Sequence, residues 1–424
     1  MALLDQYRSV LRAPHAGAAF GASLLGRLSL GMTGLSTLLL VRASSGSYAA
    51  AGLIAGLYAL AFAAGAPGRA RTADRRGPVR VLLQCSVLHP VALVLLVVLA
   101  GRHAPTSVLA LPVIAAGLSV PPLGSVMRAL WASWLVDAEL ATAYSMEAVA
   151  IELCFFIGPA LTAFLVAGAG PSAAVLVSAA LVLAGGCSLA LSAAARRVLP
   201  HPDRVGSLAG PLVSPAVRAL LLTVFWIGTA FGAIEASMPA FAQAHGRSTA
   251  SAGVLLAVWS AGSVAGGLLY GGLAVQRPHS EQLPRLVAAL SAGTLLPLLA
   301  TGPVAMGVVL FLFGTTIAPF SASNSVLLGA AAPSGTTTEA FAWNGSMIFG
   351  GLAVGTATAG WLVEHVSVTA ALAVVPVAGA LTLASSLWGL RRLGPQPLRS
   401  RPDPSRCGGR GAGGGGGGGG GVQR

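Results

Sequence analysis

Apolar segments long enough to cross a lipid bilayer follow one another along most of this chain of 424 residues. A transmembrane helix needs about 20 predominantly apolar residues, and the pattern predicts twelve such helices. A chain built this way is expected to be an all-α membrane protein that crosses the lipid bilayer many times. The expected spans are 17–41, 47–66, 79–100, 106–128, 143–167, 172–195, 216–240, 249–273, 285–301, 303–328, 339–362 and 366–390.

Composition supports this interpretation and excludes several classes of soluble protein. Only 9% of the residues are charged, whereas a soluble protein carries about 25%. All 25 basic residues are arginines, so the chain lacks the lysine that a phosphate-binding P-loop or a Schiff base requires. Because the arginines lie in short loops and in the tail, they favour a membrane topology over a nucleic-acid-binding surface. We therefore expect no nucleic acid among the partners.

Motifs for catalysis and metal binding are missing from the sequence. The four cysteines are scattered without a CxxC pair, and neither an HExxH nor a GxSxG motif occurs. Without a nucleophile, a metal-ligand set or a cofactor motif, the sequence favours a protein that is not an enzyme. No cofactor and no metal ion are expected.

A polar segment at 196–215 divides the spans into two sets of six. It is rich in arginine and proline and is predicted to be a cytoplasmic linker. The expected domains are an N-terminal six-helix bundle (1–195) and a C-terminal six-helix bundle (216–390). The tail at 391–424 is rich in arginine, proline and glycine, a composition that predicts disorder.

The arginines also predict how the chain crosses the membrane. Loops on the cytoplasmic side of a membrane protein carry an excess of basic residues. If the spans alternate, only Arg42, Arg102 and Arg247 fall in the loops of one side, and nearly all other arginines face the other side. We therefore expect a multi-pass protein of the cell membrane with both termini in the cytoplasm.

The two halves of the chain echo each other in sequence. The runs around Tyr58 and Trp259 share serine, alanine and glycine positions when these two aromatic residues are aligned. The runs around Gly158 and Gly355 match in the same way. This pattern favours a duplicated six-helix unit, and such repeats place a substrate site at their interface near the bilayer midplane.

Two short motifs resemble those of a known family. The loop between the second and third spans contains Asp74 and Arg75 followed by Gly77, which match the signature loop of the major facilitator superfamily, usually written G-x-x-x-D-R-x-G-R-R. The fifth span contains Gly158 and Pro159, which resemble the antiporter motif of that family's drug-efflux branch. The bias toward alanine, glycine, arginine and proline is similar to that of transporters from GC-rich bacteria.

This resemblance implies a fold and a mechanism. It implies the twelve-helix fold of the superfamily, in which a cavity between the two bundles opens to alternate sides of the membrane. It also implies a gating role for Asp74, Arg75 and Gly77. The loop departs from the family pattern at Ala70, where the pattern has its first glycine.

Ionisable side chains inside the spans are the candidates for transport chemistry, since inserting one costs about 2.5–3.5 kcal/mol. Arg27 lies near the middle of the first span, and Glu152 in the fifth is expected to pair with it. Proton binding at Glu152 would then release Arg27. Glu235 in the seventh span is a second candidate for proton binding, and Asn344 in the eleventh is expected to hydrogen-bond the substrate.

Three further polar residues lie closer to the ends of the spans. Five residues turn a helix by about 500°, so Glu147 points roughly 140° away from Glu152 and is expected at the membrane interface. Arg128, at the cytoplasmic end of the fourth span, is expected to bridge to Asp74 and close the inner face. Glu339 opens the eleventh span, where the helix dipole favours a carboxylate.

These features predict a secondary active transporter. The leading hypothesis is proton-coupled efflux of a small organic molecule by alternating access, with the protein acting as a monomer. One alternative is proton-coupled uptake or sugar efflux, because single residues do not specify the direction of transport. Another is a non-transporting membrane scaffold or sensor derived from the same fold.

Overall fold

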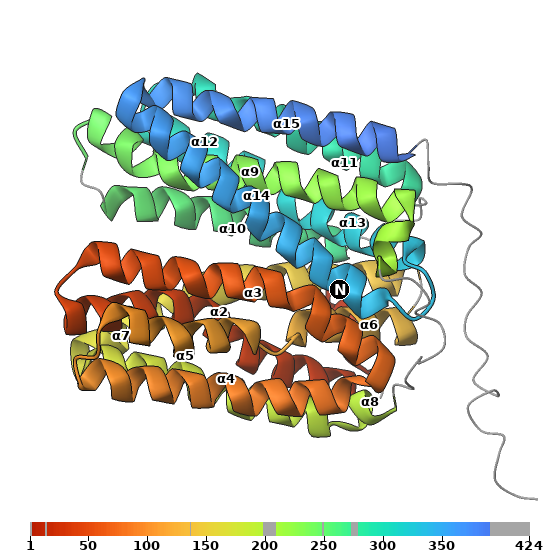
Figure 1. Cartoon of the computed structure of the whole chain (residues 1–424). Helices are drawn as coiled ribbons and strands as arrows, with labels where there is room; N and C mark the ends of the chain where they lie inside the picture. Colours follow the sequence, from red (N-terminus) through yellow and green to blue (C-terminus); the bar gives the residue numbers. More distant parts are fainter. Residues whose placement is uncertain are drawn as a thin grey trace, which may run out of the picture.

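The computed structural model describes residues 2–12, 15–135, 137–197, 209–247, 250–272 and 279–390. Within these residues the regular structure is helical, and the helices form two bundles that stack on each other (Figure 1). The predicted linker at 196–215 is described only at its two ends, and the predicted disordered tail lies outside the described residues.

The N-terminal half begins with a short helix that precedes the first span. Its spans run roughly antiparallel from one end of the bundle to the other (Figure 1). The elements of this half are α1 (Ala2–Arg12), α2 (Ala16–Ser45), α3 (Tyr48–Arg76), α4 (Pro78–Gly101), α5 (Thr106–Leu118), α6 (Leu123–Trp134), α7 (Asp137–Leu191) and α8 (Ala193–Arg196).

The C-terminal half repeats the arrangement. Its helix α14 slants across the molecule and reaches α3 of the N-terminal half (Figure 1). The elements are η1 (Gly210–Val213), α9 (Pro215–Ala244), α10 (Ala250–Gly272), α11 (His279–Gly293), η2 (Leu296–Leu299), α12 (Pro303–Gly314), α13 (Ile317–Ala331), α14 (Thr337–His365) and α15 (Val368–Leu390).

Eleven helical segments of the described residues are long and apolar enough to cross a membrane. One of them, Glu139–Leu191, has 53 residues and would be about 80 Å long if straight, far more than a bilayer of about 30 Å. It bends back at Gly170, whose backbone is not helical (φ 84°, ψ 169°). The segment therefore supplies two spans, and the twelve predicted spans are confirmed.

The fourth and tenth spans differ from the continuous helices expected from the sequence. The fourth breaks between α5 and α6, where Pro121 and Pro122 lack the N–H groups that would continue the helix. The tenth breaks between α12 and α13, at Thr315 and Thr316. Apolar periodicity extends across both breaks, so it could not reveal them.

Polar side chains of the N-terminal half bind the last carbonyls of α5, beside the first break. The Arg69 guanidinium donates to the Leu118 carbonyl and, at 3.3 Å, to the Gly117 carbonyl. His89 Nδ1 lies 2.8 Å from the Ala116 carbonyl. Since lipid offers no hydrogen bonds, an interrupted helix is stable there only with such partners.

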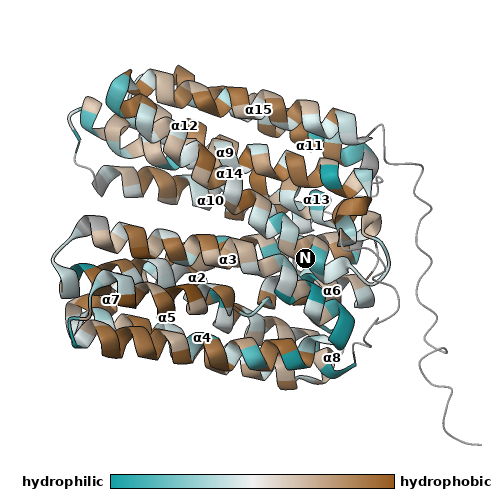
Figure 2. Ribbon diagram, viewed as in Figure 1, coloured by the Kyte–Doolittle hydropathy of each residue, from teal (hydrophilic) through white to brown (hydrophobic). Residues whose placement is uncertain are grey.

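The helices of both bundles are hydrophobic over most of their length, and hydrophilic residues gather toward the ends (Figure 2). Many leucine, valine and phenylalanine side chains are exposed, among them Leu60, Leu111 and Phe164 with 69%, 71% and 74% of their surface accessible. Exposed apolar patches of this extent mark a surface covered by another apolar phase, which here is lipid.

Equivalent helix crossings in the two halves use equivalent glycines. A Cβ atom on Gly117 would meet the Tyr58 carbonyl, and one on Gly314 would meet the Trp259 carbonyl. These contacts pair the second span with the fourth and the eighth with the tenth. They support the alignment of Tyr58 with Trp259 and the predicted duplication.

A matched pair of glycines on α14 tests this close packing. A Cβ on Gly355 would overlap the Thr229 backbone of α9, whereas Gly360 faces open space. We expect Gly355→Ala to destabilise the protein by about 1–3 kcal/mol through overpacking. Gly360→Ala should be neutral or slightly stabilising because alanine favours helix. Thermal unfolding in detergent measures both, and equal melting temperatures would contradict the close crossing.

Candidate functional site

A buried ion pair joins the first span to the fifth. The Arg27 guanidinium lies 2.5 Å from Glu147 Oε2, and the two side chains are 3% and 0% exposed. Trp131 Nε1 donates a hydrogen bond of 3.0 Å to the other carboxylate oxygen. Both oxygens of Glu147 are therefore satisfied inside the N-terminal half.

This arrangement corrects two expectations from the sequence. Arg27 pairs with Glu147 and not with Glu152, and Glu147 is buried rather than interfacial. The reason is the helical rotation between the two glutamates, which directs Glu147 into its own bundle and Glu152 toward the other half. Arg128 interacts electrostatically with Glu147 and Arg27.

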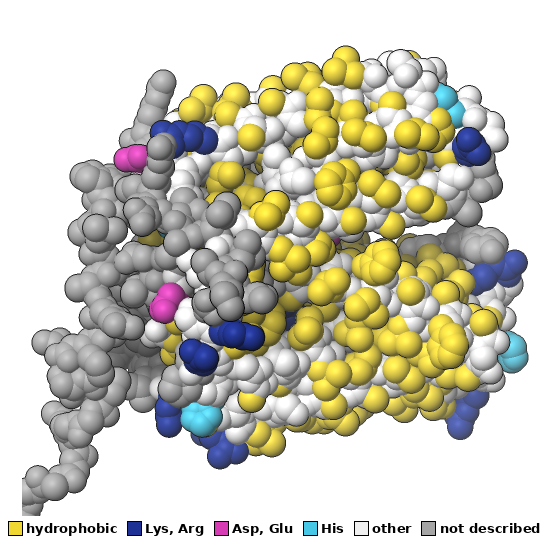
Figure 3. Space-filling model, turned by 180° about the vertical axis from the view of Figure 1, so that it is seen from behind, with side chains coloured by type: hydrophobic (Ala, Val, Ile, Leu, Met, Phe, Trp, Pro, Cys, Tyr) yellow, Lys and Arg dark blue, Asp and Glu magenta, His cyan; other side chains and the backbone are white. Residues whose placement is uncertain are grey.

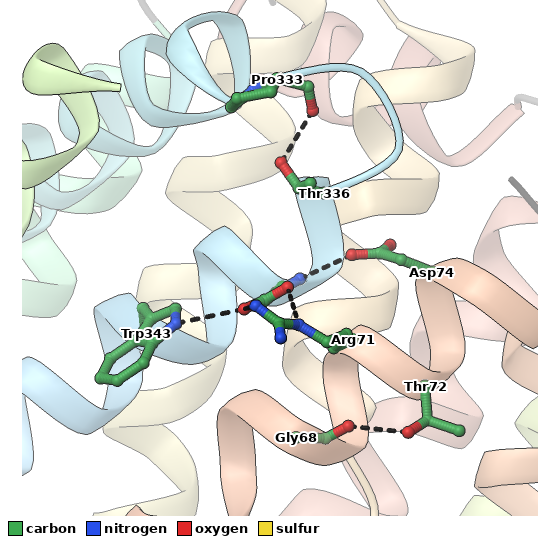
Figure 4. Close-up of polar contacts among 8 residues, drawn as sticks. Gly68, Arg71, Thr72, Asp74, Pro333, Thr336 and Trp343 are labelled. Carbon is green, nitrogen blue, oxygen red and sulfur yellow. Dashed lines mark hydrogen bonds and ion pairs between the residues drawn. The ribbon is translucent and has the colours of Figure 1, made fainter. Parts of the chain in front are cut away.

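A second polar cluster closes the end of the molecule that carries the loop between α3 and α4, here called the arginine-rich end. Asp74 accepts hydrogen bonds from the backbone N–H groups of Thr338 (3.1 Å) and Glu339 (2.8 Å) at the start of α14. One turn earlier on α3, Arg71 holds the Glu339 carboxylate with Nε and Nη2, at 2.9 and 2.8 Å (Figure 4). A carboxylate at a helix N-terminus and a two-point arginine contact are both strong polar interactions.

We call the cluster of Arg71, Asp74, Thr338 and Glu339 the gate. The predicted gating residues take different roles in it. Asp74 is part of it, but its partners belong to α14 and not to Arg128, so the expected bridge between Asp74 and Arg128 is wrong. The Arg75 side chain is exposed. Gly77 joins α3 to α4 with φ at 84°, a backbone conformation that favours glycine.

The linker between the halves also reaches the gate. Gly210, with φ at 53°, lies against Arg71 and the Glu339 carboxylate, and a Cβ there would come within 2.6 Å of both. Trp343 Nε1 lies 3.4 Å from the same carboxylate (Figure 4). The Glu339 carboxylate thus binds Arg71 of α3 and Trp343 of its own helix, and the linker passes beside it at Gly210.

A ladder of hydrogen bonds joins α7 to α10 across the two halves. Thr142 donates to the Gly271 carbonyl at 2.8 Å, and Ser145 donates to the Gly267 carbonyl at 2.5 Å. Beside them, Tyr7 of α1 donates to the Leu268 carbonyl at 2.7 Å. These contacts all lie toward the arginine-rich end.

Glu152 forms the last step of this ladder. Its carboxylate accepts hydrogen bonds from Ser263 (3.1 Å) and Ser260 (3.2 Å) of the other half. Among the described residues, no basic side chain lies within ion-pair distance of it. Beyond this step, toward the opposite end, a slit separates the two bundles (Figure 3).

The floor of the slit has aromatic side chains beside the carboxylate. The rings of Phe62 and Phe349, one from each half, lie 5.6 Å apart with an edge-to-face geometry. The Phe155 ring, one turn along α7 from Glu152, lies 6.3 Å from Phe349. We call these three phenylalanines, with Glu152, Ser260 and Ser263, the cavity floor.

Glu235 of α9 lies near this floor. Its side chain is exposed, and it interacts electrostatically with Glu152. An accessible carboxylate in the middle of an apolar helix fits a position on the wall of a cleft better than one facing lipid.

The remaining predicted residues hold the bundles together internally. Asn344 accepts a hydrogen bond of 3.2 Å from Asn324 within the C-terminal half. Gly158 packs against the Gly31 backbone, so the motif of Gly158 and Pro159 lies at the crossing of the first and fifth spans. Among the described side chains, no three His, Cys, Asp or Glu residues are grouped so that they could hold a metal ion.

The sequence analysis did not identify Arg71, Ser260 or Ser263 as functional residues. Arg71 could have been selected from its position one turn before Asp74 on the same helix face. The serines carried no comparable signal, because a serine in a span commonly donates to its own helix backbone.

The ion pair of Arg27 and Glu147 generates a prediction about stability. Glu147→Gln would leave a buried guanidinium without its counter-charge, which costs about 3–5 kcal/mol. We expect a lower melting temperature and lower yield of folded protein. Arg27→Gln combined with Glu147→Gln should recover much of the loss because the uncompensated charge is gone. Equal destabilisation by the single and double variants would contradict this.

Comparisons with known proteins agree with this geometry. A family model described as "Major Facilitator Superfamily" matches residues 19–337. No curated protein matches the chain in a sequence search. Among solved structures, a bacterial homologue of the iron transporter ferroportin in an outward-facing state is similar, with a TM-score of 0.72 at 12% identity, covering 88% of this chain and 98% of that one.

Two other structures show the same fold at low sequence identity. The human organic anion transporter MFSD10 has a TM-score of 0.69 at 17% identity, and the E. coli fucose:proton symporter FucP has 0.69 at 13%. Each comparison covers 88% of this chain and 98% of the other. Twelve spans in two six-helix halves, together with a family match over most of the chain, identify it as a multi-pass secondary transporter that belongs to the Major Facilitator Superfamily.

Proposed function

We propose that this protein exports small organic molecules across the cell membrane in exchange for protons. The observation that carries the proposal is the position of Glu152. Its carboxylate is the last contact between α7 and α10, and among the described residues its side-chain partners are two serine hydroxyls of the opposite half. A carboxylate with no basic partner can gain and lose a proton, and here the change would act directly on a contact between the halves.

The distribution of arginines supports an assignment of which side of the membrane the slit opens to. Arg75, Arg76 and Arg80 lie at the closed end, and basic loops face the cytoplasm in most membrane proteins. We assign this end, with both chain termini, to the cytoplasm. The described conformation is then open to the outside, and an external proton can reach Glu152 through the slit.

The difference between contacts within and between the halves supports alternating access. Within the C-terminal half, Gly351 and Gly355 bring the α14 backbone against α9. Between the halves, the contacts named above are hydrogen bonds, one ion pair and contacts between phenyl rings, all involving side chains. Such contacts can break without disturbing helix packing, so each bundle can move as a unit. Because one chain supplies both halves, the transport pathway is complete in a monomer.

Transport measurements test the role of Glu152. In proteoliposomes with the proposed outer face exposed to acid, wild-type protein should move protons inward when a transported solute is present on the inner side. Glu152→Gln should reduce this coupled flux by at least about tenfold, since the amide cannot be protonated. The matched control is Glu364→Gln, an exposed glutamate at the opposite end of α14 from the gate.

Three results of that assay would count against the proposal. Undiminished coupled flux in Glu152→Gln would remove the carboxylate from the mechanism. A rate of solute flux that does not depend on the proton gradient would exclude antiport. Flux of solute and protons in the same direction would replace export by proton-coupled uptake.

The gate generates a separate prediction about conformation. Hydrogen bonds to charged groups contribute about 1.5–3 kcal/mol, so Arg71→Ala should shift the equilibrium toward the inward-open state by about tenfold or more. Electron-spin distance measurements between labels at Thr72 and Ser334, on opposite sides of the gate, should show a larger population of long distances. Replacement of the native cysteines is needed before labelling.

Arg76→Ala is the matched control for the gate. Arg76 is an exposed arginine at the end of the same helix, and its loss removes the same charge. Its distance distribution should equal that of the unsubstituted protein. An equal shift in both variants would mean that net charge, and not the contact with Glu339, determines closure.

A further inference from the structure

The duplication makes two helix crossings between the halves equivalent. The alignment of Tyr58 with Trp259 relates α3 to α10, and the alignment of Gly158 with Gly355 relates α7 to α14. The crossing of α7 with α10 is therefore the counterpart of the crossing of α14 with α3. Both crossings lie where the slit ends.

One of the two equivalent crossings is polar and the other is aromatic. In the alignment, Ser263 corresponds to Phe62 and Glu152 corresponds to Phe349. At the first crossing, Ser263 donates to the Glu152 carboxylate at 3.1 Å. At the second, the Phe62 and Phe349 rings meet at 5.6 Å. A repeat that began as one unit has become polar on one side and aromatic on the other.

Phe155 connects the polar crossing at Glu152 with the aromatic crossing at Phe349. It belongs to the same helix as Glu152, lies 6.3 Å from Phe349, and leaves 41% of its surface accessible. A molecule resting on the floor would therefore touch a carboxylate at one end and phenyl rings at the other. The residues of the floor come from four helices, α3, α7, α10 and α14.

The floor contains a carboxyl group that has no basic partner among the described residues. Glu235 adds a second carboxylate close enough to interact with Glu152. Arg27, the basic side chain buried in the adjacent bundle, is paired with Glu147. None of the described basic side chains lies within ion-pair distance of Glu152 or Glu235. A partly buried carboxylate without a partner is costly, and a cationic ligand would offset that cost.

We propose that the cavity floor binds an amphipathic organic cation with an aromatic or similarly bulky apolar group. The cationic centre would lie at Glu152, where it replaces serine hydroxyls as the partner of the carboxylate. The apolar part would lie on Phe62, Phe155 and Phe349, whose ring faces also attract a cation. This inference rests on the proposed function and names the substrate class of the same cavity.

The same surface disfavours other classes of solute. An organic anion would meet two carboxylates without an opposing charge. A sugar would place hydroxyl groups against phenyl rings that cannot satisfy their hydrogen bonds, which costs binding energy. The floor therefore selects by charge on one side and by apolar contact on the other.

Direct binding measurements test the inference without a transport assay. The probes are tetraphenylphosphonium and phenylpropylammonium, each titrated into the purified full-length protein with isothermal calorimetry. Their counterparts are tetraphenylborate, of the same shape and opposite charge, and phenylpropanol, which lacks the charge. We expect saturable binding of both cations and at least about tenfold weaker binding of the counterparts.

Substitutions then separate the two sides of the floor. Glu152→Gln should weaken cation binding by at least about tenfold, and Phe349→Leu should weaken it about three- to tenfold through loss of the aromatic face. Glu364→Gln should bind as the wild type does. A melting curve for each variant shows whether it is folded, and Phe155→Leu provides a second aromatic variant if Phe349→Leu does not fold.

Several results would overturn the inference. These are equal binding of cations and counterparts, cation binding unchanged in Glu152→Gln, and absence of saturable cation binding by folded wild-type protein. If protons still exchange for a neutral or anionic solute in proteoliposomes, the proposed antiport stands and only the substrate class is wrong. If cations bind as expected but no coupled flux occurs, the inference stands and the antiport fails.

Discussion

The bilayer core supplies no hydrogen bonds and stabilises no charge, and this constraint decides where the polar groups of the protein lie. Arg27 and Glu147 neutralise each other inside one bundle. Arg69 satisfies carbonyls that the proline pair releases in the fourth span, and His89 contacts the carbonyl of Ala116 beside them. Polar groups with internal partners are structural in this protein. Glu152 differs from these groups, because its partners are serine hydroxyls of the opposite half.

The contacts within each half differ in kind from the contacts between the halves. Glycines bring helix backbones together within each half, as Gly158 does against Gly31, and such packing has no alternative arrangement of similar energy. The gate and the ladder between α7 and α10 instead depend on hydrogen bonds between polar groups. Water can replace these partners when the halves separate at that end.

Much of the fold could be predicted from the sequence because transmembrane helices are determined locally. Length and hydropathy identify a span without reference to its neighbours, and the predicted spans are confirmed, including the turn at Gly170 that separates the fifth from the sixth. The breaks in the fourth and tenth spans were missed. They leave hydropathy unchanged, and their stability depends on distant donors such as Arg69.

The acidic residues of the candidate site could be predicted from the sequence, but their partners could not. Composition alone selected Arg27, Glu152 and Glu235, because a charge in an apolar run is costly and therefore informative. It could not assign the partner of Arg27, since Glu147 and Glu152 occur on one helix and differ only in the face they present. Nor could it place Ser263 beside Glu152, because that contact joins helices from different halves.

The sequence by itself determined that this chain is a duplicated bundle of membrane helices with acidic residues inside it, because hydropathy, repeat and charge are properties of short segments. Only the tertiary structure decided which acid pairs with Arg27 and which accepts hydrogen bonds from the opposite half. It also decided that Asp74 meets the start of α14 rather than Arg128. The physical reason is that ion pairs and gates depend on the rotation and crossing of helices far apart in the chain.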